Sequence, residues 1–473
     1  MVIHIHDSAR GELVPFQPLV SGAVSMYVCG PTVQGAPHVG HLRSALVYDL
    51  WRRWFEFSGF KVTIVRNVTD IDDKILEKAA SETKSGNSIT WREVAYKYER
   101  EFDRAYDSLG LQAVNLAPRA TESIAEMIAL IAKLIERGHA YRATDGSADV
   151  YFDTASFPEY GQFTRQKLAD MADAEDADPR GKKDPRDFTL WKSHKASEPA
   201  DAAWDSPWGK GRPGWHIECS AMATRFLGEQ FDIHGGGLDL RFPHHENELA
   251  QSRAAGYPFA NYWMHNGLVN VASQKMSKSL NNFVLANDFL KKGDRLVLRY
   301  FLSSAHYRSV LELSDALVAE SASAFSRITG FLLRASRKLG LTQLPEPGAL
   351  NDLPESFVAA MNDDLSVPEA MAVIHETVRL GNTALDAGDT ETVSSNLKFV
   401  VTMLEVLGLN PADEKSGDQA ATALDQLVKQ LVSERNQARA SKDFARSDEI
   451  RSQLADAGIA LEDSGTETTW SFK

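Results

Sequence analysis

The spacing of apolar positions changes twice near the start of the chain. Residues 24–29, Val-Ser-Met-Tyr-Val-Cys, form a short run typical of a strand. After the turn formers Gly30 and Pro31, apolar side chains recur every three or four residues, which predicts a helix with one buried face. Its apolar positions are Leu42, Leu46, Leu50, Trp54 and Phe57. Residues 61–65, rich in β-branched side chains, predict a second strand. Strand, helix and strand at this spacing predict a βαβ unit and an α/β fold with a doubly wound, parallel, Rossmann-type sheet.

The rest of the chain is mostly helical in pattern. Residues 85–140 predict helices, and residues beyond 312 predict a helical bundle that Ser314 caps. The apolar stripe of that first bundle helix is Leu317, Ala324, Phe325, Ile328 and Leu332. Residues 410–418 have the composition of a linker, and from about 421 a helical pair and a turn-rich end predict a small α+β module.

One internal stretch has an unusual charge pattern. Residues 168–187 are first acidic and then basic, with two prolines, which predicts a surface loop or insertion. The alternative is that Arg180, Lys182 and Lys183 contact RNA.

Composition narrows the class of protein. The chain has 473 residues, of which 43% are hydrophobic and 25% charged, as in ordinary soluble proteins of two to four domains. We expect a cytoplasmic protein, because no apolar run approaches about 20 residues and the first residues lack a signal-peptide pattern. The net charge of -14 gives no support for nucleic-acid binding, and the two cysteines, Cys29 and Cys219, exclude a disulfide framework.

Both cysteines are candidate metal ligands. Downstream of Cys219, Pro243 is placed to open a helix, and His244 and Glu248 are four residues apart on one helical face. Two thiolates, an imidazole and a carboxylate form a tetrahedral zinc set. The spacing by itself favours the alternative, two buried thiols beside an acidic helix start, because Cys29 lies 190 residues before Cys219 and only the fold can join them.

Two further elements are candidates for binding phosphate. His38, Gly40 and His41 stand at the start of the first helix, where free N–H groups and the helix dipole favour anions. Far along the chain, Lys275-Met-Ser-Lys278-Ser279 places two lysines and two hydroxyls in five residues. Each element alone also fits an ordinary helix start or an exposed polar loop.

Together, these two elements resemble the signature pair of class I aminoacyl-tRNA synthetases. Several further blocks are similar to those of cysteinyl-tRNA synthetases: Cys29-Gly-Pro-Thr-Val, Asn67-Val-Thr-Asp-Ile-Asp-Asp-Lys74, Gly214-Trp-His-Ile-Glu-Cys219, Phe231-Asp-Ile-His-Gly-Gly-Gly237, Phe242-Pro-His-His-Glu-Asn-Glu248, Lys442-Asp-Phe-Ala and Gly458-Ile-Ala-Leu-Glu-Asp. Val39 departs from the family's usual isoleucine, and Gln34-Gly-Ala-Pro differs from its commoner tyrosine-containing form.

The resemblance implies a set of site residues. It implies one zinc ion per chain on Cys29, Cys219, His244 and Glu248, with His245 and Glu246 outside the ligand set. Mg-ATP would be held by His38, Gly40, His41 and Lys278, with Lys275 in support. The cysteine pocket would comprise Gly30, Thr32, Thr69, Trp215, His234 and Asp239. The implied partners are ATP, L-cysteine and a cysteine tRNA, and we expect a monomer with no membrane contact.

The resemblance also implies a division of the chain. Residues 1–115 and 206–270 would be the halves of the catalytic domain, 116–205 a connective insertion, and 271–311 the K-M-S-K-S loop with a stem-contact region. Residues 312–409 would be the helical bundle and 421–473 the anticodon-binding module. In that module, Arg435, Arg439, Lys442 and Arg446 are spaced to share one helical face, and Trp470 would stack on a base or cap a small core.

Two other functions stay open. A cysteine ligase of the mycothiol pathway shares the zinc site and both signatures but joins cysteine to an amino-sugar and lacks the C-terminal module. A catalytically inactive paralogue would only bind RNA or zinc, and the intact histidines and lysines of both signatures argue against it.

Overall fold

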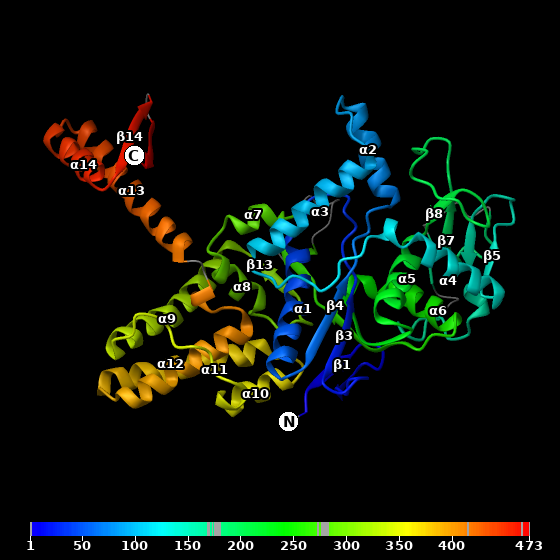
Figure 1. The fold of residues 1–473 in the computed structure, drawn as a ribbon, viewed down its shortest axis with the longest axis horizontal. Coiled ribbons are helices and arrows are strands. Elements are labelled where there is room, and N and C mark those ends of the chain that lie inside the picture. Colours follow the sequence, from blue (N-terminus) through cyan, green and yellow to red (C-terminus); the bar gives the residue numbers. More distant parts are fainter. Residues whose placement is uncertain are drawn as a thin grey trace. The chain divides into compact units, whose positions relative to one another are not determined.

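The computed structural model describes residues 2–167, 171–172, 174, 181–271, 274–275, 283–413, 416–464 and 467–472 (Figure 1). The chain divides into two compact units, Met1–Leu409 and Asn410–Lys473. Within the described residues, no helix is long and apolar enough to cross a membrane.

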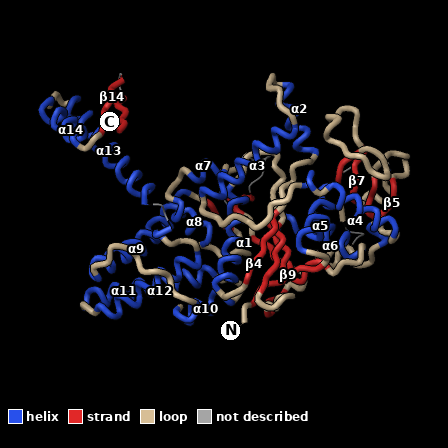
Figure 2. The backbone as a smooth tube through the Cα atoms, in the orientation of Figure 1, coloured by secondary structure: helices blue, strands red, loops and turns tan. Residues whose placement is uncertain are grey.

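A parallel four-stranded sheet forms the centre of the first unit. Its order is β10 (Phe259–Asn266), β9 (Gln230–Gly237), β3 (Ala23–Val28) and β4 (Lys61–Arg66). Helix α1 (Val39–Phe57) connects β3 to β4 and buries the predicted apolar face, so the predicted βαβ unit is confirmed. Figure 2 shows these strands with helices beside them. Because β3 lies inside the sheet, its carboxyl end is close to the ends of β4 and β9.

Helices and a second sheet surround this centre. Helix α2 (Asp73–Lys84) precedes the stretch 85–140, in which α3 (Trp91–Ser108) and α4 (Ile124–Glu136) confirm the predicted helical pattern. An antiparallel sheet follows, in the order β5 (Ala140–Arg142), β6 (Val150–Phe152), β7 (Phe188–Ser193) and β8 (Gly211–Pro213). Its last strand lies beyond residue 205 and leads directly into α5 (Trp215–Leu227).

The charged stretch 168–187 is only partly described. Arg180 lies outside the described residues. Lys182 is buried, with its Nζ donating to the Ala174 carbonyl oxygen, so neither the predicted surface loop nor the alternative RNA contact holds at this residue. Lys183 is exposed and forms an ion pair of 3.7 Å with Asp153. The described part of this stretch therefore gives no support for an RNA contact.

The remaining elements of the first unit are small strands and the helical bundle. The small strands are β1 (His4–Asp7), β2 (Glu12–Pro15), β11 (Val269–Val271), β12 (Gln274–Lys275) and β13 (Leu311–Leu313). The helices are α6 (Glu246–Ala254), α7 (Ala286–Leu290), α8 (Arg295–Ser303), α9 (Asp315–Leu339), α10 (Glu355–Asn362), α11 (Val367–Ala387) and α12 (Thr390–Leu407). Ser314 caps α9 as predicted, and Phe325, Ile328 and Leu332 are buried. Leu317 is 38% exposed and does not belong to the buried stripe.

The second unit contains a helical pair and a hairpin. Its elements are α13 (Ser416–Ala440), α14 (Phe444–Asp456), β14 (Ile459–Ser464) and β15 (Glu467–Phe472). Helix α13 thus begins inside the predicted linker, and the predicted turn-rich end forms the hairpin. Val428, Ile450, Leu454 and Ile459 form a core of its own, against which Trp470 packs.

The predicted basic face of this unit is wrong. Helix α13 ends at Ala440, and Lys442 lies in the following turn with a φ of 62°. Arg435 is buried, whereas Arg446 belongs to α14 and pairs with Glu449. The spacing of four, three and four residues therefore does not align these side chains, because a turn interrupts the helix between them.

Candidate active site

Four elements bring the predicted metal ligands together. Cys29 directly follows β3, Cys219 lies on α5, and Glu248 lies on α6. His244 precedes α6 in a five-residue π-helical turn, Arg241–His245, so Pro243 does not open an α-helix as predicted. One donor atom from each of the four residues lies within 4.8 Å of the others.

The donor atoms fit a tetrahedral zinc ion. The two sulfur atoms are 3.7 Å apart, close to the separation of about 3.8 Å for tetrahedral thiolates at the usual Zn–S distance. Oε1 of Glu248 is 3.3 Å from Sγ of Cys29 and 3.0 Å from Nε2 of His244. Burial alone would raise the pKa of the Glu248 carboxyl, but His234 and His244 hold it well below its usual value. The Glu248 carboxylate thus stays ionised beside two cysteine sulfurs and the His244 imidazole, a set of donors that suits zinc.

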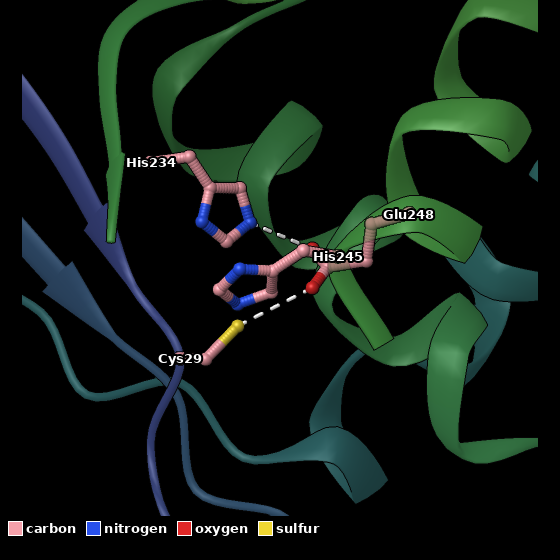
Figure 3. Close-up of side chains that lie close together, drawn as sticks. All are labelled: Cys29, His234, His245 and Glu248. Carbon is pink, nitrogen blue, oxygen red and sulfur yellow. Dashed lines mark hydrogen bonds and ion pairs between the residues drawn. The ribbon is translucent and has the colours of Figure 1, made fainter. Parts of the chain in front are cut away.

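A second donor set overlaps the first. Cys29, His234, His245 and Glu248 also offer atoms within 4.8 Å of one another (Figure 3). Nε2 of His234 lies 2.8 Å from Oε2 of Glu248, and both side chains are fully buried. His234 therefore orients a predicted ligand, and His245, which the sequence placed outside the ligand set, points into the same cluster.

Sequence reasoning missed two histidines of this cluster. Nδ1 of His245 is 2.8 Å from Nε2 of His265, and Nδ1 of His216 is 3.0 Å from Nδ1 of His244. His216 stands inside the Gly214–Cys219 block, which was a usable signal. His265 belongs to strand β10 and carries no local motif. Trp215 stacks on the His244 ring with centroids 4.2 Å apart, so it lies beside one of the candidate metal ligands.

The first signature is built on the cap of α1. Nδ1 of His38 accepts a hydrogen bond from the Gly40 N–H at 3.2 Å, and Nδ1 of His41 accepts one from the His38 N–H at 3.1 Å. A neutral imidazole that accepts through Nδ1 carries its proton on Nε2. Burial lowers the pKa of His38 to about 4 and that of His41 well below its usual value. Both rings are therefore neutral at pH 7 and keep an Nε2–H donor for a ligand.

Asp239 lies close enough to His38 to affect its pKa. It is exposed in a 3-10 turn, Leu238–Leu240, after β9, and its charge raises the pKa of His38 against the effect of burial. The predicted pocket residue and the predicted phosphate-binding histidine thus lie in the same region.

The other predicted pocket residues join the ends of β3 and β4. The Gly30 N–H donates to Oδ1 of Asn67 at 2.8 Å, and a Cβ on Gly30 would lie 1.6 Å from the Asn67 carbonyl oxygen. Thr32 and Thr69 form a parallel bridge. The Thr69 hydroxyl donates to Oε2 of Glu218 at 2.8 Å, and burial raises the pKa of that carboxyl well above its usual value. Asn67 and Glu218, which the sequence did not single out, thus hold this wall together.

The second signature is described only in part. Lys275 belongs to β12, where its backbone pairs with that of Asn270. Lys278 lies outside the described residues.

Comparison with known proteins identifies three domain families and several full-length relatives. Residues 15–323 match the family model of the class I (C) tRNA synthetase catalytic domain, 356–411 a DALR domain, and 421–470 the cysteinyl-tRNA ligase anticodon binding domain. Proteins named cysteine–tRNA ligase from Clavibacter sepedonicus and Leifsonia xyli subsp. xyli are 57% and 55% identical. The alignments cover 100% of this chain and 99% and 100% of those proteins.

Solved structures agree at the level of the fold. Methionyl-tRNA synthetase of Mycobacterium tuberculosis in complex with methionyl-adenylate superposes with a TM-score of 0.58 at 14% identity. The superposition covers 82% of this chain and 90% of that one. It confirms the predicted α/β architecture with its helical region. The family models and the full-length relatives show that the chain belongs to the cysteinyl-tRNA synthetases, the cysteine–tRNA ligases of class I.

Proposed function

We propose that the chain joins L-cysteine to ATP, forming cysteinyl-adenylate and pyrophosphate, and then transfers cysteine to the 3′ end of a cysteine tRNA. The observation that carries this proposal is the cluster of Cys29, Cys219, His244 and Glu248, in which Cys29 is half-buried and the other three are buried, together with the capped start of α1. The names of the full-length relatives support the same reaction.

The four clustered donors would select the amino acid. Serine differs from cysteine by one atom, and a pocket discriminates poorly between near-isosteres by shape. Zinc, when bound by these residues, would supply a strong preference for a thiolate over a hydroxyl. Trp215, stacked on His244, would border the bound side chain. His234 would hold Glu248 in place through its 2.8 Å hydrogen bond.

The start of α1 would stabilise adenylate formation. The cysteine carboxylate needs no general base, because it is already ionised; it attacks the α-phosphorus while the bond to pyrophosphate breaks. Nε2–H of His38 and of His41 would donate to phosphate oxygens of Mg-ATP, so that each neutral ring stabilises the phosphate charge with its single N–H proton. We assign Lys275 and Lys278 to the opposite side of the phosphates, on the resemblance of their motif alone.

We keep the division of the chain as part of the proposal. Residues 1–115 and 206–270 would carry the chemistry, 116–205 the connective insertion, 271–311 and 312–409 the stem contacts and the bundle. Residues 421–473 would read the anticodon, which the match of 421–470 to an anticodon-binding domain supports. We propose that the enzyme works as a monomer in the cytoplasm.

The decisive experiment measures two reactions of the purified chain. Cysteine-dependent exchange of pyrophosphate into ATP tests adenylation, and charging of a cysteine tRNA tests transfer. Exchange with cysteine, none with serine, and charging of the tRNA are expected. Exchange without charging, together with transfer of cysteine to an amino-sugar, would instead identify a mycothiol-pathway ligase.

A further inference from the structure

Arg43 is a buried arginine two residues beyond His41 on α1. Its side chain is 1% exposed. Nη1 donates to the carbonyl oxygens of Leu268 at 2.6 Å and Gly267 at 3.4 Å. Nη2 donates to those of Ser309 at 2.7 Å and His306 at 3.2 Å. Among the described residues, no carboxylate forms an ion pair with it.

Moving a charged guanidinium from water into the protein interior costs free energy, which hydrogen bonds must offset where no carboxylate is paired with it. Burial lowers the pKa of Arg43 to about 10, so the group stays charged at pH 7. Four carbonyl dipoles offset its charge, and the planar fork serves two chain segments at once. A lysine, with one nitrogen, cannot reach both segments in this way.

The two segments lead into the small sheet of the second signature. Gly267 and Leu268 precede β11, and His306 to Ser309 precede β13, which pairs with β11 in parallel. The Gly267 N–H donates to the Tyr307 carbonyl oxygen at 2.7 Å. A Cβ on Gly267 would lie 2.2 Å from the Ser309 carbonyl oxygen. These close contacts leave the segments little freedom while Arg43 holds them.

Strand β11 in turn carries β12. Asn270 pairs with Lys275 in the antiparallel register of these two strands. The start of α1 is also bonded to the chain beyond the signature, because the Val39 N–H donates to the Val284 carbonyl oxygen at 3.0 Å. The helix that bears His38 and His41 is therefore joined to the described chain on both sides of the K-M-S-K-S motif.

We propose that Arg43 is a positioning residue for adenylate formation, which fixes β11 and β12, and with them Lys275, relative to His38 and His41. The inference rests on the proposed function, since adenylation is its readout. A displacement of about 1 Å at a reacting group costs roughly 100-fold in rate. Loss of the four hydrogen bonds should therefore slow the chemical step without touching the metal ligands.

The test compares Arg43→Lys with Arg299→Lys. Arg299 is the control, because it is also a fully buried arginine that donates to carbonyl oxygens, those of Leu407 at 2.9 Å and Gly110 at 3.3 Å, and it differs from Arg43 in also pairing with Asp49. Single-turnover adenylate formation at saturating ATP and cysteine is measured together with the KM for cysteine, zinc content and Tm. We expect Arg43→Lys to slow the step by about 10- to 100-fold with cysteine KM and zinc content unchanged. Arg299→Lys should lower the Tm without that loss of rate.

A milder variant covers the case in which Arg43→Lys does not fold. The Ser44 hydroxyl donates to Oδ1 of Asn266 at 2.9 Å, immediately before the same segment, and Ser44→Ala should give a smaller loss in the same rate. An unchanged chemical step in the folded variants would overturn the proposal, as would a parallel loss of zinc or cysteine affinity. Wild-type protein without cysteine-dependent exchange would instead reject the proposed function, and this inference with it.

Discussion

At the scale of single residues, the histidines divide into two groups by what their nitrogens contact. His38 and His41 use Nδ1 to cap α1 and keep Nε2 free for a ligand. His234, His244 and His245 are buried around Glu248, where each contact selects a ring orientation. The first group thus lies at the start of a helix, whereas the second surrounds a buried carboxylate.

His38 should contribute to stability and to catalysis separately. His38→Ala removes the cap and the Nε2–H donor, so we expect a loss of roughly 1 kcal/mol in stability and about 100-fold in adenylation rate. His38→Asn keeps a capping oxygen but has no N–H at the position of the histidine Nε2, so it should recover the stability and not the rate. Urea unfolding and single-turnover kinetics measure the two effects. Recovery of the rate in His38→Asn would show that the histidine acts only through the helix cap.

The two overlapping donor sets make opposite predictions for zinc. If Cys29, Cys219, His244 and Glu248 hold the ion, Cys219→Ser should abolish stoichiometric zinc and raise the KM for cysteine. His245→Gln should then weaken zinc affinity by at most about 10- to 100-fold and bind one equivalent at saturating zinc. Bound zinc per chain, measured for both variants at defined concentrations of free zinc, distinguishes the two donor sets. Full zinc in Cys219→Ser and none in His245→Gln would assign the ion to His234 and His245 instead.

At the scale of elements, α1 is held at its middle by a buried ion pair. Asp49 on α1 contacts Arg299 of α8, accepts from Nε of Arg53 at 3.0 Å, and accepts the Gln112 N–H at 2.8 Å. Arg299 also donates to the Leu407 carbonyl oxygen at the end of α12. The helix that carries the first signature is therefore anchored to the bundle at a point away from the site.

Asp49→Asn should destabilise the first unit strongly. It leaves Arg299 buried without its partner, which typically costs about 3–5 kcal/mol. Burial alone would raise the pKa of Asp49, but Arg299 and Arg53 hold it below its usual value of 3.8. A carboxyl whose pKa is lower in the folded protein stabilises the fold at pH values above its pKa in the unfolded chain. This stabilisation is lost as the pH falls through its pKa in the folded protein. The difference between wild type and Asp49→Asn in urea unfolding should therefore shrink below about pH 4.

An exposed ion pair provides the control for this experiment. Asp315 contacts Nζ of Lys292 at 2.6 Å but is 86% exposed. Asp315→Asn should change stability by less than about 1 kcal/mol. Equal effects of the two substitutions would mean that Asp49 does not act as a buried anchor.

At the scale of the whole molecule, each compact unit has a core of its own. The core of the second unit is small, and α13 begins at Ser416, directly after the division of the chain near Asn410. A unit with its own core can be removed with less damage than one that shares a core.

Removal of residues 416–473 should therefore separate the two half-reactions. We expect cysteine-dependent pyrophosphate exchange to remain largely intact, because every described site residue lies in Met1–Leu409. Charging at limiting tRNA should fall sharply, because the proposed anticodon-binding module is lost. Both reactions are measured on the same sample. Charging at the full-length rate would rule out the anticodon role.

Local patterns in the sequence were enough to predict the helices, strands and caps that residues a few positions apart form together. The βαβ unit, the buried face of α1 and the Ser314 cap rest on period and capping chemistry, so they could be predicted. Spacing alone failed where a turn intervened, as at Lys442, where the predicted basic helix face does not exist.

Local sequence patterns could not predict which residues meet in the candidate site; the resemblance to a known family named some of them, and the tertiary structure brings them together. Cys29 and Cys219 are 190 residues apart, and the packing of α5, which carries Cys219, against β3 decides that their sulfurs lie 3.7 Å apart. The contacts of Arg43 with four carbonyl oxygens, and of His265 with His245, leave no periodic trace in the sequence. Period and capping report on residues a few positions apart, whereas these contacts follow from how distant strands and helices pack.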